Sequence, residues 1–188
     1  MVGIGIFLGL LLLIALYIIS VYNALVSLQV RTKESWSGVE THLKRRYDLI
    51  PNLVETVKGY AKHEEKTLTA VISARNMAMN APAQTVQKEQ YENMLTGALK
   101  SLFAVTESYP DLKANQSFLQ LQTEIAETET YIQNARQSYN SVVADLNQRI
   151  RVFPSNFIAK MFGILEERFF ELEDSEREAA KKAPQVQF

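Results

Sequence analysis

The stretch THLKRRYDLIPNLVETVKGYAKHE, residues 41–64, decides how the first half of this chain folds. It carries three adjacent cations, a proline in mid-run and a His-Glu pair, so it could be a site, a hinge or a packed helix. Its apolar residues recur every three or four positions, the spacing that puts side chains on one face of a helix. The same phase extends in both directions through Trp36, Val39, Leu43, Arg46, Ile50, Leu53, Val57, Tyr60, Glu64, Leu68, Val71 and Arg75.

Pro51 lies inside this periodic run. A proline in a helix interior removes one backbone hydrogen bond and clashes with the preceding turn, at a cost of about 3 kcal/mol or more. The phase of the apolar positions nevertheless runs straight across it. The spacing therefore favours a kinked, continuous helix over a turn at Pro51.

Residues 2–22, VGIGIFLGLLLLIALYIISVY, contain no charged side chain. A helix needs about 20 apolar residues to cross the hydrocarbon core of a bilayer. No basic region precedes the run and no small-x-small cleavage site follows it, which favours a retained transmembrane helix over a cleaved signal peptide. Residues 1–22 are therefore predicted to be a membrane anchor. Because Arg31 and Lys33 follow the span, the body of the protein is expected to face the cytoplasm.

The anchor is expected to continue into the body as one helix. Between Ser20 and Pro51 the only glycine is Gly38, and an isolated glycine costs a helix only about 1 kcal/mol. The sequence predicts no break before NAPAQ at 80–84, which reads as a loop. From Arg31 to Met79 such a helix would be about 70 Å long at 1.5 Å per residue.

Three further helices follow this loop. The first covers about 85–108, with Tyr91, Met94, Leu95, Ala98, Leu102 and Val105 on its apolar side. After the turn YPDLKAN, Asn115 is a suitable N-cap for a long helix that ends before Pro154, where Ser155 can cap a short last helix. The long helix carries a three-four stripe of Phe118, Leu121, Ile125, Thr128, Ile132, Ala135, Tyr139, Val142, Leu146, Arg149 and Phe153.

These patterns predict an all-α protein in which the transmembrane helix continues into an elongated, up-and-down four-helix bundle of unequal helices. The anchor covers 1–22, the bundle 23–165 and a charged tail 166–188. Phe169 and Phe170 are too apolar for a free tail, so we expect them to dock on this bundle or on a neighbour.

No motif in the chain predicts an enzyme. There is no cysteine, and the net charge of −1 gives no pull toward nucleic acid. His63-Glu64 does not continue as a HExxH zinc helix, because position 67 is threonine. His63 and the distant His42 are expected to be surface or satisfied histidines. The prediction is a protein without catalytic residue, cofactor, metal or small-molecule substrate.

The cations Lys44, Arg45 and Arg46 have two interpretations left once a lipid-binding patch is set aside. In a continuous helix Arg45 would lie about 35 Å beyond the span, whereas a membrane field decays over about 8 Å. One interpretation is surface pairing within the helix, such as Arg45 with Asp48. The other is that Arg46, at a core-phase position, reaches a buried or intersubunit carboxylate.

Several residues are candidates for interaction rather than chemistry. Gly5 and Gly9 form a small-xxx-small pair that could let two transmembrane helices approach closely. The complete set of structural candidates is Gly5, Gly9, Arg45, Arg46, Asp48, Pro51, Asn52, Phe169 and Phe170.

The chain resembles the LemA family of bacterial membrane proteins. The resemblance rests on the apolar N-terminus, YNALVSLQ (22–29), the Trp36 segment, LKRRYDLIPNLVETVKGYAKHE (43–64), AR (74–75), YPDLKAN (109–115), FLQLQTEIAETE (118–129), ARQSYN (135–140) and FPSN (153–156). It implies a single-pass anchor in the bacterial inner membrane and a helical bundle, and it supplies no catalytic residue. It also implies associations with magnetosome membranes and with HtpX-type membrane proteases.

The leading functional hypothesis is a non-enzymatic membrane scaffold. Such a protein would contact membrane lipid, form a homo-oligomer, and organise membrane or partner proteins. The alternative is an adaptor or regulator of an HtpX-type membrane protease, with the first long helix or the Phe-rich tail as the docking element. A hydrolase with an unrecognised site is a third class, which would draw attention to His42 or His63.

Overall fold

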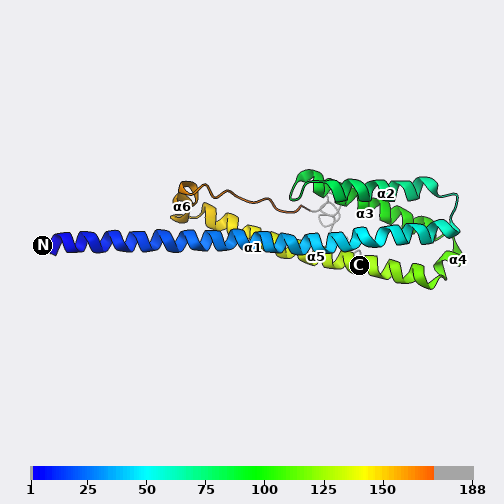
Figure 1. Cartoon of the computed structure of the whole chain (residues 1–188), viewed down its shortest axis with the longest axis horizontal. Helices are drawn as coiled ribbons and strands as arrows, with labels where there is room; N and C mark the ends of the chain where they lie inside the picture. Colours follow the sequence, from blue (N-terminus) through cyan, green and yellow to red (C-terminus); the bar gives the residue numbers. More distant parts are fainter. Residues whose placement is uncertain (1, 172–188) are drawn as a thin grey trace, which may run out of the picture. The chain divides into compact units, whose positions relative to one another are not determined.

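The computed structural model describes residues 2–171, and Figure 1 shows the course of each helix. This part of the chain is all-α, as predicted. The helices are α1 (Val2–Tyr60), α2 (Glu65–Asn80), α3 (Val86–Thr106), α4 (Pro110–Lys113), α5 (Gln116–Arg151) and α6 (Ser155–Met161). The described residues form two compact units: unit 1 takes 2–39 and 134–169, and unit 2 takes 40–133 and 170–171.

Helix α1 is helical over 59 residues, including the whole range 20–36 that joins its apolar start to the rest of the helix. The predicted continuity through this joint is confirmed. Among residues 2–171, α1 is the helix that is long and apolar enough to cross a membrane. Its side chains from Val2 to Tyr17 are exposed, as expected for a segment that lipid would surround.

The predicted continuation of this helix to Met79 is wrong, because α1 ends at Tyr60 and α2 begins at Glu65. In the turn between them, the Glu64 N–H donates to the Ala61 carbonyl, 3.1 Å away. The Tyr109 hydroxyl donates to the Glu64 carboxylate at 3.0 Å and holds this turn in place. Four residues are close to one helical turn, so the apolar phase stays the same across the break and could not reveal it.

Pro51 lies within α1, so the prediction that it does not end the helix is confirmed. Because Pro51 has no N–H, the carbonyl of Tyr47, four residues earlier, loses its helical donor. The Arg75 Nε on α2 donates to that carbonyl at 2.8 Å. The proline therefore frees an acceptor on α1 that α2 uses when it folds back along α1.

The loop and cap predictions for the middle of the chain hold. Helix α2 ends at Asn80, and the Thr85 hydroxyl caps α3 by accepting from the Lys88 N–H at 3.1 Å. The Asn115 side chain accepts from the Phe118 N–H at 3.0 Å and caps α5 as predicted. The turn YPDLKAN also contains the one-turn helix α4.

The predicted apolar side of α3 is only partly correct. Leu95 and Leu102 are buried, but Met94 is exposed, and the buried face of the helix includes three charged side chains. These are Lys88, Glu89 and Glu92. The helix is rotated relative to the prediction because its charged residues, not its methionine, face the other helices of unit 2.

The buried stripe of the first two helices follows the sequence pattern closely. Trp36, Val39, Leu43, Arg46, Ile50, Leu53, Val57, Leu68 and Val71 are buried, whereas Tyr60 is exposed. On α5 the stripe is buried from Phe118 to Leu146 except at Leu121, Ala135 and Val142, which are half-buried, and Arg149 and Phe153 are exposed. The apolar pattern therefore overestimates the packed length of α5 by about two helical turns.

Two predictions about the fourth helix need correction. The four bundle helices of unit 2 are the end of α1, α2, α3 and the start of α5. The first predicted helix is divided at residues 61–64, and its second part, α2, takes the place that the prediction gave to the segment after Pro154. Helix α6 has seven residues and belongs to unit 1. Ser155 does not cap it, because its hydroxyl donates to the carbonyls of Arg149 and Val152 at the end of α5.

The change of hydrogen-bond donor at the Tyr47 carbonyl can be tested by a double-mutant cycle. We expect Arg75→Ala to lower the free energy of unfolding by about 1–3 kcal/mol, because it leaves the Tyr47 carbonyl without a donor. In a Pro51→Ala background the cost should shrink, because the substituted alanine restores an intrahelical N–H for the same carbonyl. Chemical unfolding followed by circular dichroism in detergent measures both costs. Equal costs in the two backgrounds would contradict the proposed link.

Candidate functional site

Arg46 is the centre of a buried polar network in unit 2. Its side chain is only 1% exposed, although a guanidinium is charged at any ordinary pH. One terminal nitrogen, Nη2, donates to the Glu92 carboxylate of α3. The other, Nη1, donates to Glu129 of α5 at 2.5 Å and to the Thr96 hydroxyl at 3.2 Å. The carboxylate predicted to receive Arg46 is therefore supplied within the chain, by two helices.

Lys88 and Tyr47 complete this network on the other side of Glu92. The Lys88 ammonium donates to the Ala78 carbonyl at 2.7 Å and to the Tyr47 hydroxyl at 2.9 Å, and lies 3.4 Å from the Glu92 carboxylate. The Tyr47 hydroxyl in turn donates to Glu92. Burial, and next the negative charge of Glu92, raise the pKa of Tyr47 far above its ordinary value. Tyr47 therefore stays protonated and remains a donor.

The network is balanced in charge. Two cations, Arg46 and Lys88, face two carboxylates, Glu92 and Glu129. A buried ion pair gains little net stability over an apolar core, but removing one partner is costly because the other charge is then buried without a counter-charge. The network therefore acts chiefly as a register: α1, α3 and α5 must bring these four groups together when they pack.

The other candidate residues near Arg46 are less constrained. The predicted Arg45–Asp48 pair is not formed, and Arg45 Nη2 instead lies 3.8 Å from the Glu124 carboxylate of α5. Asn52 is exposed, and its backbone carbonyl accepts from the Thr56 hydroxyl. These contacts are surface interactions that contribute about 1 kcal/mol or less each.

The two histidines lie apart, as expected. His42 stacks on Tyr131 of α5 with ring centroids 5.4 Å apart, and His63 is exposed in the turn after α1. Within residues 2–171, no group of three or more His, Asp or Glu side chains is arranged to hold a metal ion. Gly5 and Gly9 lie on the exposed start of α1, and nothing lies within 4 Å of the Cβ position at either.

The chain after α6 forms a strap along α5, which the sequence analysis did not foresee. The Asn147 side chain accepts from the Glu167 N–H at 2.9 Å and donates to the Glu167 carbonyl at 2.8 Å. The Tyr139 hydroxyl donates to the Arg168 carbonyl at 2.9 Å. The predicted docking of the Phe-rich segment holds for Phe170, which is 3% exposed, but not for Phe169, which is 44% exposed. The rest of the predicted tail lies outside the described residues.

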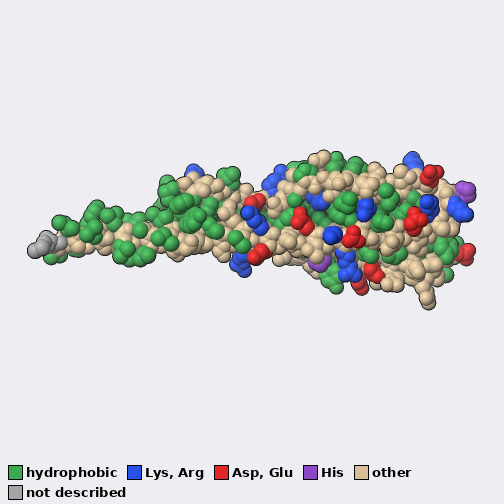
Figure 2. Space-filling view, viewed as in Figure 1, with side chains coloured by type: hydrophobic (Ala, Val, Ile, Leu, Met, Phe, Trp, Pro, Cys, Tyr) green, Lys and Arg blue, Asp and Glu red, His purple; other side chains and the backbone are tan. Residues whose placement is uncertain are grey.

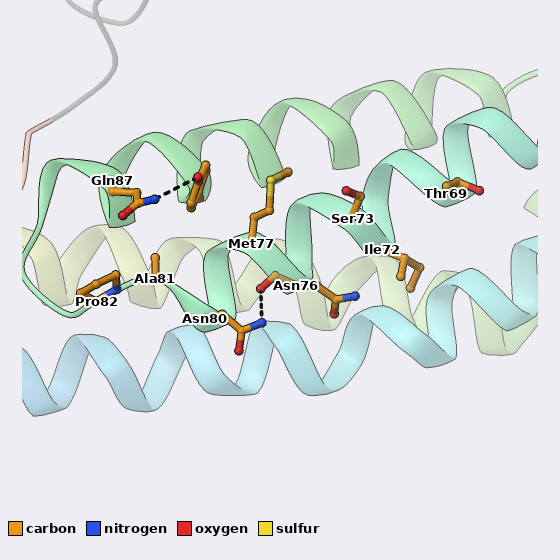
Figure 3. A pocket seen from close by; sticks show the side chains of 10 residues that line it. Thr69, Ile72, Ser73, Asn76, Met77, Asn80, Ala81, Pro82 and Gln87 are labelled. Atoms are coloured by element: carbon orange, nitrogen blue, oxygen red, sulfur yellow. Dashed lines mark hydrogen bonds between the residues drawn. The ribbon is translucent and has the colours of Figure 1, made fainter.

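The exposed side of α2 and α3 carries few charges, which are Glu65 and Lys66 in the first turn of α2 and Lys100 on α3. An open groove between these helices is lined by uncharged side chains alone, and Figure 3 shows those of α2, from Thr69 to Asn80, together with Gln87 at the start of α3. The exposed positions continue along α3 with one charged residue, Lys100. We call this surface the α2–α3 face; its residues are Thr69, Ile72, Ser73, Asn76, Met77, Asn80, Gln87, Gln90, Tyr91, Met94, Gly97 and Ser101.

Comparison with known protein families agrees with the fold and the motifs. The LemA family model matches residues 35–188, which is most of the chain. The chain belongs to the LemA family. The match includes the buried network and the α2–α3 face, so both are features of the LemA-like region.

Relatives of this LemA-family chain include proteins with two different names. Protein LemA of Metamycoplasma hominis is 25% identical over 155 residues, covering 82% of this chain and 71% of the relative. Magnetosome proteins MamQ 1 and MamQ 2 of Paramagnetospirillum magneticum are each 23% identical, covering 80% of this chain. The alignment spans 64% of the length of each MamQ protein, which is therefore longer than the matched region.

The register role of the network predicts an unusual order of stabilities. Glu92→Leu should lower the free energy of unfolding by about 3–5 kcal/mol, because it removes the carboxylate that neutralises the buried Arg46 and Lys88 charges. Arg46→Met combined with Glu92→Leu should lose less than Glu92→Leu alone, because an apolar pair replaces the ion pair. Guanidinium chloride unfolding followed by helix ellipticity measures the difference.

Arg45→Met is the matched control for these variants, since Arg45 is exposed and adjacent in sequence. It should change the free energy of unfolding by less than about 1 kcal/mol. A double variant less stable than Glu92→Leu would contradict the assignment of Arg46 and Glu92 as one coupled pair.

Proposed function

We propose that this LemA-family chain is a non-enzymatic, membrane-anchored protein that self-associates through the α2–α3 face and so organises membrane or partner proteins. The observation that carries the proposal is that α3 has most of its charged side chains on its buried side and mostly uncharged side chains on its exposed side. Lys88, Glu89 and Glu92 are buried, while Lys100 is the one charged residue among its exposed positions, which otherwise carry valine, glutamine, methionine, glycine, serine and alanine. Depletion of charge distinguishes the centre of an interface from ordinary surface.

A second copy of the chain is the occupant that this chemistry fits best. In a two-fold dimer each group of the patch faces the same patch of the partner, so a charged face would repel itself. Amide side chains such as Asn76, Asn80, Gln87 and Gln90 carry donors and acceptors together and can pair with their own copies. The face therefore meets the main chemical requirement of a self-complementary interface.

The size of the face fits a small interface. Helix α2 has 16 residues and is therefore about 24 Å long, and two adjacent helices present a strip roughly 20 Å wide. Such a footprint is about 480 Å² per partner, which lies below the ~800 Å² of a standard interface and in the range of small, transient ones. The membrane anchor adds to this, because copies held in one bilayer by α1 meet at a raised effective concentration.

The anchor and the relatives support the cellular setting of the proposal. Arg31 and Lys33 follow the apolar start of α1, which favours insertion in the inner membrane with the body in the cytoplasm. The MamQ relatives are named magnetosome proteins. That name supports, for this chain, a role as part of a cellular structure.

The test is the mass of the full-length protein in nanodiscs. We expect oligomers for the unaltered chain, and dissociation for Ser73→Lys, which places a charge in the centre of the face. Juxtaposed like charges cost several kcal/mol, so the dissociation constant should rise at least tenfold. Ser138→Lys makes the same change at an exposed position of α5 and should leave the oligomer intact.

Two results would contradict this proposal. One is a monomer of the unaltered chain at high protein density in the disc. The other is an oligomer that is equally stable in both lysine variants. A photo-crosslinker at Ser73 that captures a membrane protease instead of another copy would favour the adaptor role.

A further inference from the structure

The chain from Val152 to Leu165 exposes an unusual amount of apolar surface. This segment, which we call the 152–165 turn, includes α6 and carries one charged residue, Lys160. Figure 2 shows hydrophobic side chains gathered around it. Its exposed large apolar residues are Val152, Phe153, Phe157, Met161, Phe162 and Leu165, with Phe153 and Leu165 about three-quarters exposed.

The inner side of the 152–165 turn is packed firmly on α1. Ile158, Ala159 and Ile164 share a buried cluster with Val21 and Leu25 of α1 and with Leu146 of α5. The Phe162 ring contacts Tyr22 of α1, with centroids 4.5 Å apart. Phe157 and Met161 line an apolar surface groove together with Tyr17 and Ile18. The turn is thus fixed beside residues 17–25 of α1, and all of these contacts lie within unit 1.

This position corresponds to one boundary of the membrane. Counting from Val2, residues 2–22 span about 30 Å, the thickness of the hydrocarbon core. Residues 17–22 then occupy roughly its last 7–8 Å. An amphipathic segment that lies in the interface buries its apolar side about 5–10 Å deep. The depth at which α1 holds the 152–165 turn therefore matches the depth at which such segments reside.

We propose that the 152–165 turn is a second membrane contact, which lies in the interface of the same bilayer that α1 crosses. The occupant of its exposed apolar side is lipid, because that side is continuous with the exposed apolar surface of α1 at Tyr17 and Ile18. Tryptophan and tyrosine concentrate at membrane interfaces, and Tyr17 and Tyr22 lie beside the turn. The Lys160 ammonium can extend to the headgroups while its stem stays apolar.

A second contact changes what the anchor does. A single helix in a bilayer is free to rotate about its axis and to tilt. The 152–165 turn projects from one side of α1. Its insertion into the interface therefore selects one rotation of α1 about its own axis. The proposal does not depend on self-association through the α2–α3 face, and either can hold without the other.

Nitroxide accessibility in liposomes tests the proposal on the full chain. The protein contains no cysteine, so Phe157→Cys and Leu165→Cys each give a single labelled site at an exposed position. Collisions with oxygen, which concentrates in lipid, are compared with collisions with a water-soluble nickel chelate. Leu12→Cys provides the lipid reference, and Leu119→Cys, an exposed apolar position of α5, provides the aqueous one.

We expect an oxygen-to-nickel ratio at both sites at least several-fold above that at Leu119 and close to that at Leu12. A ratio equal to that at Leu119 would place the turn in water and overturn the proposal. Low collision with both reagents together with dipolar broadening would show that another copy covers the turn, and would overturn it as well. An aqueous signal at Leu12 would remove the membrane span on which the proposal rests.

Discussion

The burial of one guanidinium, that of Arg46, is the constraint on which the packing of unit 2 depends. An arginine on the core face of α1 is tolerable only if carboxylates arrive from elsewhere, and they come from Glu92 on α3 and Glu129 on α5. Lys88 and Tyr47 then satisfy the remaining oxygen of Glu92. Three helices that could slide past one another on apolar contacts alone are thereby held in one register.

The same constraint shapes the outer surface. Lys88, Glu89 and Glu92 of α3 are turned inward, where Glu92 binds Arg46, and its exposed side is left with amide, methionine and small side chains and with Lys100. In unit 1 two segments, the start of α1 and the 152–165 turn, expose mainly apolar residues instead. The molecule therefore presents two kinds of surface with little charge, one suited to another protein and one suited to lipid.

Much of this fold follows from the sequence, and the failures have physical causes. Residue type identified the cap at Asn115, and periodicity identified the buried face of α1 and the continuity at Pro51, because each depends on neighbouring residues. It missed the turn at 61–64, since a gap of one helical turn keeps the phase of the apolar positions.

The apolar pattern misplaced the buried side of α3 because only hydrophobic residues were assumed to be inside. Lys88, Glu92 and Leu95 share one face, so two charges in the phase of a buried leucine were the available signal. The strap on Asn147 pairs side chains with a distant backbone, which leaves no local pattern.

The central claim is that charge is collected inside unit 2 so that the α2–α3 face can bind a second copy of the chain. The most direct measurement is the dipolar coupling between nitroxides at Gln90→Cys in protein reconstituted at low density in bilayers. The account predicts a narrow intermolecular distance distribution, lost when Ser73→Lys is added. A featureless decay, as given by copies spread at random in the membrane, would contradict it.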